Sequence, residues 1–170
     1  VRVEASTEHI DYLRDVKPIL DKHCVTCHSC YNSPCQAKMS SFEGIDRGAS
    51  KLQAYNARRL HAADPTRLLI DAKSTSGWRN KGFYSFTQSK DSNETHNDSL
   101  MMHLLYDKKE HSQIIGEYSP ETDDLICPKN KEELGEYLED KPNHGMPYGL
   151  PALKVQEYTT LAQWLQHLNK

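Results

Sequence analysis

Apolar residues recur at helical spacing at both ends of the chain. Over Thr7–His23 they fall on one helix face, with Thr7 as the expected N-cap, and Pro18 inside the segment predicts a kink or a restart. Near the C-terminus the spacing i, i+3, i+4, i+7 predicts a second amphipathic helix, whose apolar positions are Tyr158, Leu161, Ala162, Leu165 and Leu168. We therefore expect one helix near each end of the fold.

Shorter helices are predicted between these two. Ser40 and Glu43 have the spacing of a capping box, which predicts a helix through the small residues that follow. The segment Asn97–Lys109 begins with capping residues and ends with two lysines, as the helix dipole favours, and Asn130–Glu139 predicts a further helix, ended by Pro142. Because no segment alternates apolar and polar residues over the length of a strand, we expect an all-α fold.

Length and charge narrow the class of protein. A chain of 170 residues with 36% hydrophobic and 26% charged residues is typical of one globular domain, so we expect residues 1–170 to form a single domain. The 21 Lys and Arg against 24 Asp and Glu give a net charge of -3 without a basic block, which argues against nucleic acid as a partner. No apolar run approaches the length of a membrane span. Since the chain starts at Val1, we expect a processed product or a fragment of a longer protein.

Candidate chemistry concentrates in HCVTCHSCYNSPC, residues 23–35, which holds four of the five cysteines. An iron–sulfur run would need three residues between its last two cysteines, whereas four separate Cys30 from Cys35. Zinc usually takes two cysteine pairs joined by a longer loop. The five residues Cys24–His28 instead have the form C-x-x-C-H, in which Cys24 and Cys27 attach a haem through thioethers and the next imidazole binds its iron. This motif predicts one covalently attached haem c.

A haem iron with His28 on one side takes a sixth ligand, and HGMPYGLPAL near the C-terminus supplies candidates. Met146 precedes a proline that restricts its backbone to extended geometry, so a stiff loop presents the thioether. Turn residues flank it, which argues against a core role, whereas Met101 and Met102 lie on a helical apolar face and are expected in the core. We expect His28 and Met146 as iron ligands, with His144 as the alternative to the methionine.

The order of these features resembles that of a class I c-type cytochrome. An entering helix, the CVTCH motif, a later Met-Pro loop and a closing helix occur in that sequence along the chain. The resemblance implies an all-α fold in which the first and last helices cross and the haem lies between His and Met. A long insertion between the C-x-x-C-H motif and the Met loop would distinguish this chain from compact members.

A narrower resemblance covers nearly the whole chain. The segments CHSCYNSPCQAKMSSFEGIDRGASK, RRLHAADPTRL, WRNKGF, CPKN and HGMPYGLPAL are similar to the N-terminal cytochrome region of bacterial fatty acid cis/trans isomerases. The resemblance implies a periplasmic haem c enzyme that converts cis double bonds of phospholipid acyl chains to trans by one-electron chemistry, with peripheral membrane contact. It also implies that the whole enzyme is longer. The alternative function is a monohaem cytochrome that exchanges electrons with a redox partner protein.

The remaining candidates depend on the expected haem. Because haem c is attached outside the cytoplasm, we expect a disulfide among Cys30, Cys35 and Cys127; a bridge that involves Cys35 is favoured, and its partner stays open. Trp78 and Arg79, in GWRNKGF, combine a large ring with a cation that can cover a haem and hold a propionate. The alternative for this segment is a surface loop anchored by its Trp.

Overall fold

The fold is all-helical over the part of the chain that the structure describes. The computed structural model describes residues 9–30, 32–54, 62–64, 66–88, 98–112 and 126–168. Within these ranges no strand is formed, and extended backbone pairs only in the isolated bridges Ala49–Tyr84 and Leu68–Ala72. The predicted all-α class is confirmed.

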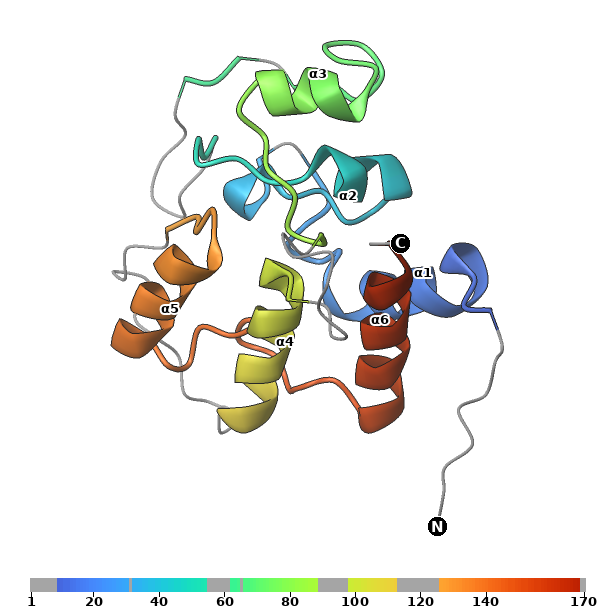
Figure 1. The fold of residues 1–170 in the computed structure, drawn as a ribbon, viewed down its shortest axis with the longest axis vertical. Coiled ribbons are helices and arrows are strands. Elements are labelled where there is room, and N and C mark those ends of the chain that lie inside the picture. The colour runs from blue at the N-terminus through green and yellow to red at the C-terminus, as the bar shows by residue number, and fades with distance from the viewer. Residues whose placement is uncertain are drawn as a thin grey trace.

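The described residues form six α-helices and two shorter helical segments, one directly before α1 and one between α1 and α2. In chain order the elements are η1 (Tyr12–Val16), α1 (Lys17–His23), η2 (Pro34–Gln36), α2 (Phe42–Arg47), α3 (Thr75–Asn80), α4 (Leu100–Glu110), α5 (Lys131–Asp140) and α6 (Val155–Leu168). Figure 1 shows α2 and α3 stacked at one end of the molecule, with α4, α5 and α6 at the other. The segment that follows α1 runs between these two groups.

The first and last helical segments pack against each other. Their contact contains four fully buried aliphatic side chains, Val16, Leu20, Leu161 and Leu165. Beside them the ring of Tyr12 lies 5.8 Å from that of Trp164, centroid to centroid. Burial of each such aliphatic side chain contributes about 1.5–3 kcal/mol, so this contact is a main source of stability.

The N-terminal helix restarts near Pro18, as the sequence predicts. The π-helical turn η1 passes into α1, which carries the proline in its first turn, where the missing N–H costs no hydrogen bond. The N-cap of η1 is Asp11, whose carboxylate accepts a hydrogen bond from the Arg14 N–H at 2.8 Å. The expected cap, Thr7, lies outside the described residues.

The predicted middle helices are present, some with shifted ends. The cap of α2 is Ser41 and not Ser40; its hydroxyl accepts from the Gly44 N–H at 3.1 Å. This helix ends at Arg47 because Gly48 takes a φ of +86°, a conformation that glycine adopts without steric cost. The predictions for α4 and α5 are confirmed, and Met101 and Met102 on α4 belong to the core as expected.

An ion-pair cluster on Glu157 joins α1 to α6. The carboxylate accepts a hydrogen bond from Lys22 Nζ at 2.8 Å, lies 3.0 Å from His23 Nε2, and also accepts from the Lys154 N–H at 3.1 Å. These contacts, the one from Lys22 first, lower the pKa of Glu157 to about 2. The carboxylate therefore stays ionised well below the pH at which an unfolded glutamate is protonated.

Replacing Glu157 with glutamine is expected to lower the free energy of unfolding by about 1 kcal/mol at pH 7. Because folding lowers the pKa of Glu157, its carboxylate stabilises the fold at pH values above the ordinary glutamate pKa of 4.5. This stabilisation is lost as the pH falls toward 2. Denaturant titrations between pH 2 and 7 should therefore show the two proteins converging at low pH. Glu139→Gln, at an exposed position of α5, is the control, and a difference that does not depend on pH would contradict the assignment.

Candidate functional site

The C-x-x-C-H motif forms one turn that continues from α1. The Cys24 N–H donates to the Leu20 carbonyl at 2.8 Å, and the Cys24 carbonyl accepts from the N–H groups of Cys27 and His28, at 3.2 and 2.9 Å. Residues three and four positions apart in such a turn lie on the same side. The two thiols and the imidazole that the sequence predicts as a haem attachment site are therefore presented together.

Neither motif thiol is in a disulfide, and their surroundings differ. Cys24 is half-buried against the core, and Cys27 is exposed. Burial, and then the nearby Cys27, raise the pKa of Cys24 to about 11. The buried sulfur is thus uncharged, and a thioether at this position would also be an uncharged sulfur.

The His28 ring is held through one nitrogen. Its Nδ1 lies 3.1 Å from the carbonyl oxygen of Ala37, and because a carbonyl only accepts, Nδ1 carries the proton and Nε2 is the nitrogen with the lone pair. Burial lowers the pKa of His28, which favours the neutral imidazole that binds metals. A metal-binding histidine is oriented in this way by a hydrogen bond from its second nitrogen.

The loop that holds His28 is fixed at several further points. The Ala37 carbonyl also accepts from the Ser33 hydroxyl at 2.9 Å, and the Met39 N–H donates to the His28 carbonyl at 2.7 Å. These hydrogen bonds connect His28 to Ala37 and Met39 and set the position of the imidazole.

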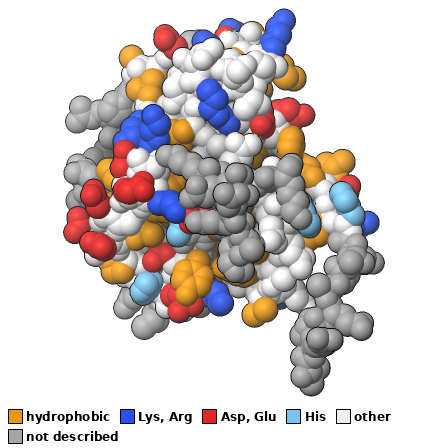
Figure 2. All heavy atoms as spheres, viewed as in Figure 1, with side chains coloured by type: hydrophobic (Ala, Val, Ile, Leu, Met, Phe, Trp, Pro, Cys, Tyr) orange, Lys and Arg blue, Asp and Glu red, His pale blue; other side chains and the backbone are white. Residues whose placement is uncertain are grey.

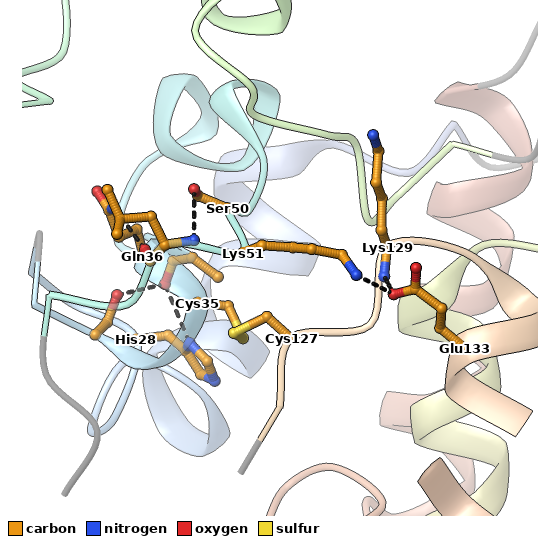
Figure 3. The surroundings of a disulfide bond; sticks show 11 residues. His28, Cys35, Gln36, Ser50, Lys51, Cys127, Lys129 and Glu133 are labelled. Atoms are coloured by element: carbon orange, nitrogen blue, oxygen red, sulfur yellow. Dashed lines mark hydrogen bonds and ion pairs between the residues drawn. A yellow bond between two sulfur atoms is a disulfide. The ribbon is translucent and has the colours of Figure 1, made fainter. Parts of the chain in front are cut away.

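A disulfide joins this loop to the segment before α5. Cys35 is bonded to Cys127 across 92 positions of the chain, with the two Cα atoms 5.5 Å apart (Figure 3). The structure thereby chooses between the pairings that the sequence leaves open, and Cys30 is an exposed free thiol. Because the Cys35 sulfur is in the bridge, it is not a fourth ligand for a cluster of cysteines at residues 24–35.

An ion pair lies beside the disulfide. Lys51 donates to Glu133 at 2.6 Å, and Glu133 also accepts from the Lys129 N–H at 3.0 Å (Figure 3). These contacts attach the start of α5 to the extended segment after α2. The disulfide and the ion pair thus attach two different segments, the loop of Cys35 and the segment after α2, to the region at the start of α5.

A buried arginine, Arg47, also holds the loop that contains His28. The Arg47 guanidinium donates to the carbonyls of Gln36, at 2.5 Å, and Thr66, at 2.7 Å, and lies over the rings of Phe83 and Trp78, 5.0 and 5.7 Å from their centroids. Burial lowers its pKa. Sequence reasoning missed Arg47, since an arginine is usually exposed and nothing in the surrounding letters marks this one.

Trp78 and Arg79 belong to α3, and both side chains contact α2. Trp78 is buried and packs edge-on against Phe83, with centroids 5.3 Å apart. Arg79 donates to the carbonyls of Asp46 and Arg47, at 3.1 and 2.8 Å, at the C-terminal end of α2. This agrees with the alternative interpretation of an anchoring Trp, and a role of either residue toward a haem propionate stays a prediction.

The Met146 loop is fastened to α4. The Met146 N–H donates to the Leu104 carbonyl at 3.0 Å. The Gly145 backbone lies so close to α4 that a Cβ on it would be 2.5 Å from the backbone nitrogen of Lys108. Met146 is half-buried, and it is not among the described hydrophobic side chains that pack on the core. This position supports a ligand role over a packing role.

The alternative ligand, His144, is held by two tyrosines. Its Nδ1 lies 2.5 Å from the Tyr137 hydroxyl, and its buried ring makes edge contacts with Tyr137 and Tyr148, at centroid distances of 5.4 and 5.0 Å. His28 is also held through its Nδ1, so this contact does not decide between the two candidates. Met146 stays the predicted sixth ligand, with His144 as the alternative.

Replacing Gly145 with alanine is expected to displace the Met146 loop and to lower the free energy of unfolding by about 1–3 kcal/mol, because the added Cβ would meet backbone atoms of α4. Denaturant titration measures the loss. Gly135→Ala, within α5 and with no atom near the added Cβ, is the matched control and is expected to raise stability by about 0.5–1 kcal/mol. Equal effects of the two changes would show that the close contact at Gly145 is unimportant.

The residues of the Cys24–His28 turn are compatible with a haem. Within the described ranges, no three His, Cys, Asp or Glu side chains are grouped so as to hold a metal ion. A haem supplies four nitrogens itself and takes one or two axial ligands from the protein. An oriented imidazole beside two free thiols meets that need.

Among the described helices, none is both long and apolar enough to cross a bilayer.

Comparison with known proteins identifies a family. The model of the family described as fatty acid cis/trans isomerase (CTI) matches residues 63–169. The matched range includes Cys127, Met146 and the helices α3 to α6, and the turn Cys24–His28 precedes it. Neither the curated proteins nor the solved structures contain a match to this chain.

Proposed function

The chain belongs to the fatty acid cis/trans isomerase family, and on that premise we propose that it is the haem c domain of a periplasmic enzyme. The proposed substrates are cis-unsaturated acyl chains of phospholipids, and the products are their trans isomers. The family match supports acyl substrates and isomerisation. The haem and the compartment are proposals that depend on the residues described next.

One observation carries the haem proposal. The His28 imidazole is oriented by the Ala37 carbonyl and belongs to the same turn as two unbridged thiols, Cys24 and Cys27. We propose that these thiols would form the thioethers to a haem and that His28 Nε2 and the Met146 sulfur would bind its iron. In this account the Ala37 carbonyl keeps Nε2 as the nitrogen available to iron.

The proposed reaction involves no net oxidation, so it requires neither ATP nor an external reductant. When bound, a haem would supply reversible one-electron transfer: a π bond that has lost one electron can rotate, and the return of that electron restores the double bond. The protein contributes a methionine ligand, which raises the reduction potential, and a loop that the disulfide and Arg47 keep in place. Because His28 and Met146 would both bind the iron, the alkene is not expected to bind it.

The disulfide supports the periplasm as the compartment. Disulfides persist in oxidising compartments and are rare in the cytosol. The Cys35–Cys127 bridge encloses much of the chain and secures the loop of His28, so it is a structural bond. We propose that haem attachment and disulfide formation both take place after export.

Gas chromatography of phospholipid acyl chains tests this function. Vesicles of cis-unsaturated phospholipid are incubated with the haem-loaded chain and, separately, with the product of the full reading frame. Trans acyl chains are expected from the full product, and none from Cys24→Ser/Cys27→Ser. Cys30→Ser, which removes the exposed third thiol, is the matched control and should leave conversion unchanged. Absence of conversion by both wild-type proteins would overturn the proposal.

A further inference from the structure

A turn on the surface before α3 carries two aliphatic side chains into solvent. Leu69 is 64% exposed and its neighbour Ile70 is 63% exposed. Neither belongs to the hydrophobic cluster formed by the described residues. Single exposed aliphatic residues are common, but two adjacent ones at the tip of a turn form an apolar projection. We refer to residues 67–72 as the aliphatic turn.

The aliphatic turn is held rigid by its two ends. The Arg67 guanidinium donates to both carboxylate oxygens of Asp71, at 3.0 and 3.1 Å, and the Arg67 N–H donates to the same carboxylate at 2.6 Å. In return, the Asp71 N–H donates to the Arg67 carbonyl at 3.0 Å. The pairing with Arg67 lowers the pKa of Asp71 to about 2, so the pair stays ionised at neutral pH.

The backbone at the tip is in an unusual conformation for its residue. Leu69 has a φ of +64°, in the left-handed region. For a residue with a side chain, this backbone conformation costs about 1–2 kcal/mol of free energy. Glycine would avoid this cost. The turn thus keeps a large aliphatic side chain exposed at a position where the backbone favours another residue.

The segment that contains the aliphatic turn carries an excess of positive charge. Residues 66–83 contain four cations, Arg67, Lys73, Arg79 and Lys81, and one carboxylate, so their net charge is +3, whereas the whole chain carries -3. Lys73 and Lys81 are exposed. From the adjoining helix α2, Asp46 adds one carboxylate, which accepts a hydrogen bond from Thr75 at 2.6 Å. Figure 2 shows blue and orange side chains side by side at the α3 end of the molecule.

We propose that the aliphatic turn docks the protein onto an anionic phospholipid bilayer. Leu69 and Ile70 enter the boundary between headgroups and acyl chains, and Lys73 and Lys81 lie against the lipid phosphates. Apolar side chains beside cations are the combination that binds such an interface, because apolar burial and attraction to anionic lipid add. The inference rests on the proposed function, since an enzyme that acts on phospholipid acyl chains must approach a membrane.

Vesicle sedimentation tests the proposal with the haem-loaded chain. Binding is measured to vesicles of phosphatidylglycerol and phosphatidylcholine in equal parts and to phosphatidylcholine alone. Leu69→Ser/Ile70→Ser is expected to weaken binding by about tenfold or more, as loss of two aliphatic anchors implies. The matched control is Leu13→Ser/Val155→Ser, which removes two aliphatic side chains that are 70% and 78% exposed elsewhere, and it should bind as the wild type does.

The charges are tested separately from the aliphatic anchors. Lys73→Gln/Lys81→Gln is expected to weaken binding to the anionic vesicles severalfold and to reduce its salt dependence, with little effect on phosphatidylcholine vesicles. A tryptophan introduced as Ile70→Trp should be quenched by brominated acyl chains. Quenching no greater than that of a Val155→Trp variant would overturn the insertion of the turn.

The outcomes separate this inference from the proposed function. If the wild type and the Leu69→Ser/Ile70→Ser variant bind vesicles equally, the docking proposal is wrong even if the protein isomerises acyl chains. Vesicle binding that depends on the turn, without trans product from either the chain or the full product, would support docking and contradict the isomerase proposal. If both proposals hold, the variant loses conversion of vesicle phospholipid but retains conversion of a dispersed free cis fatty acid.

Discussion

Replacing Met146 with alanine is expected to abolish the absorption band that marks an iron–thioether bond in the oxidised holoprotein. The same change should lower the reduction potential by a substantial part of the roughly 0.8 V range that axial ligands span, because methionine stabilises the reduced iron. The fold should survive, since Met146 does not pack on the core and the hydrogen bond of its N–H to Leu104 involves backbone atoms only. Visible spectra and a potentiometric titration measure the two effects.

Met102→Ala is the control for this experiment. Met102 packs on the core from α4, so its loss should affect stability and leave the band in place. A band that persists in Met146→Ala would contradict the ligand assignment. In that case a thioether elsewhere would bind the iron. A wild type without any such band would direct attention to His144, and His144→Ala would then be the variant that changes the spectrum.

Removing the disulfide with Cys35→Ser/Cys127→Ser is expected to lower the free energy of unfolding by about 4–5 kcal/mol, as the chain-entropy model gives for a loop of this length. The bridge closes a loop of 92 positions, which restricts the unfolded chain strongly. The bridge also fixes Cys35, two residues before Ala37. Because the Ala37 carbonyl holds the His28 ring, the position of His28 depends on the bridge. Denaturant titration with and without a reducing agent measures the loss.

Cys30→Ser is the matched control for the disulfide. This cysteine is exposed and unbridged, and the substitution should change the free energy of unfolding by less than about 0.5 kcal/mol. A reducing agent should destabilise the wild type and Cys30→Ser alike and leave the double variant unaffected. Equal stability of the wild type and the double variant would contradict a structural role for the bridge.

The helices whose signals are local in the sequence are predicted well. Apolar periodicity and capping residues locate α6, α4 and α5, because these helices are long enough for the spacing to repeat. Short elements lack that repetition. The helix α3 has six residues, of which only Trp78 is both large and buried, and its Ser74 cap stands in a run of serines and threonines that offers several equal starts.

The parts of the site that depend on distant contacts are not predictable from one sequence. The motif Cys24–His28 can be recognised from the sequence alone, because its chemistry depends on neighbouring positions. The pairing of Cys35 with Cys127 depends on how the segment before α5 returns to the loop of His28. The role of Arg47 depends likewise on Gln36, 11 positions away, and on rings from α3 and the segment after it.

The mass of the denatured chain tests the central claim most directly. The protein is produced in a bacterium that attaches haem c to exported chains, unfolded, and weighed intact by mass spectrometry. The account predicts a chain heavier by one haem, and Cys24→Ser/Cys27→Ser at the mass of the polypeptide alone. A wild-type chain at the mass of its polypeptide, or haem that is lost on unfolding, would contradict the haem attachment on which the proposed function depends.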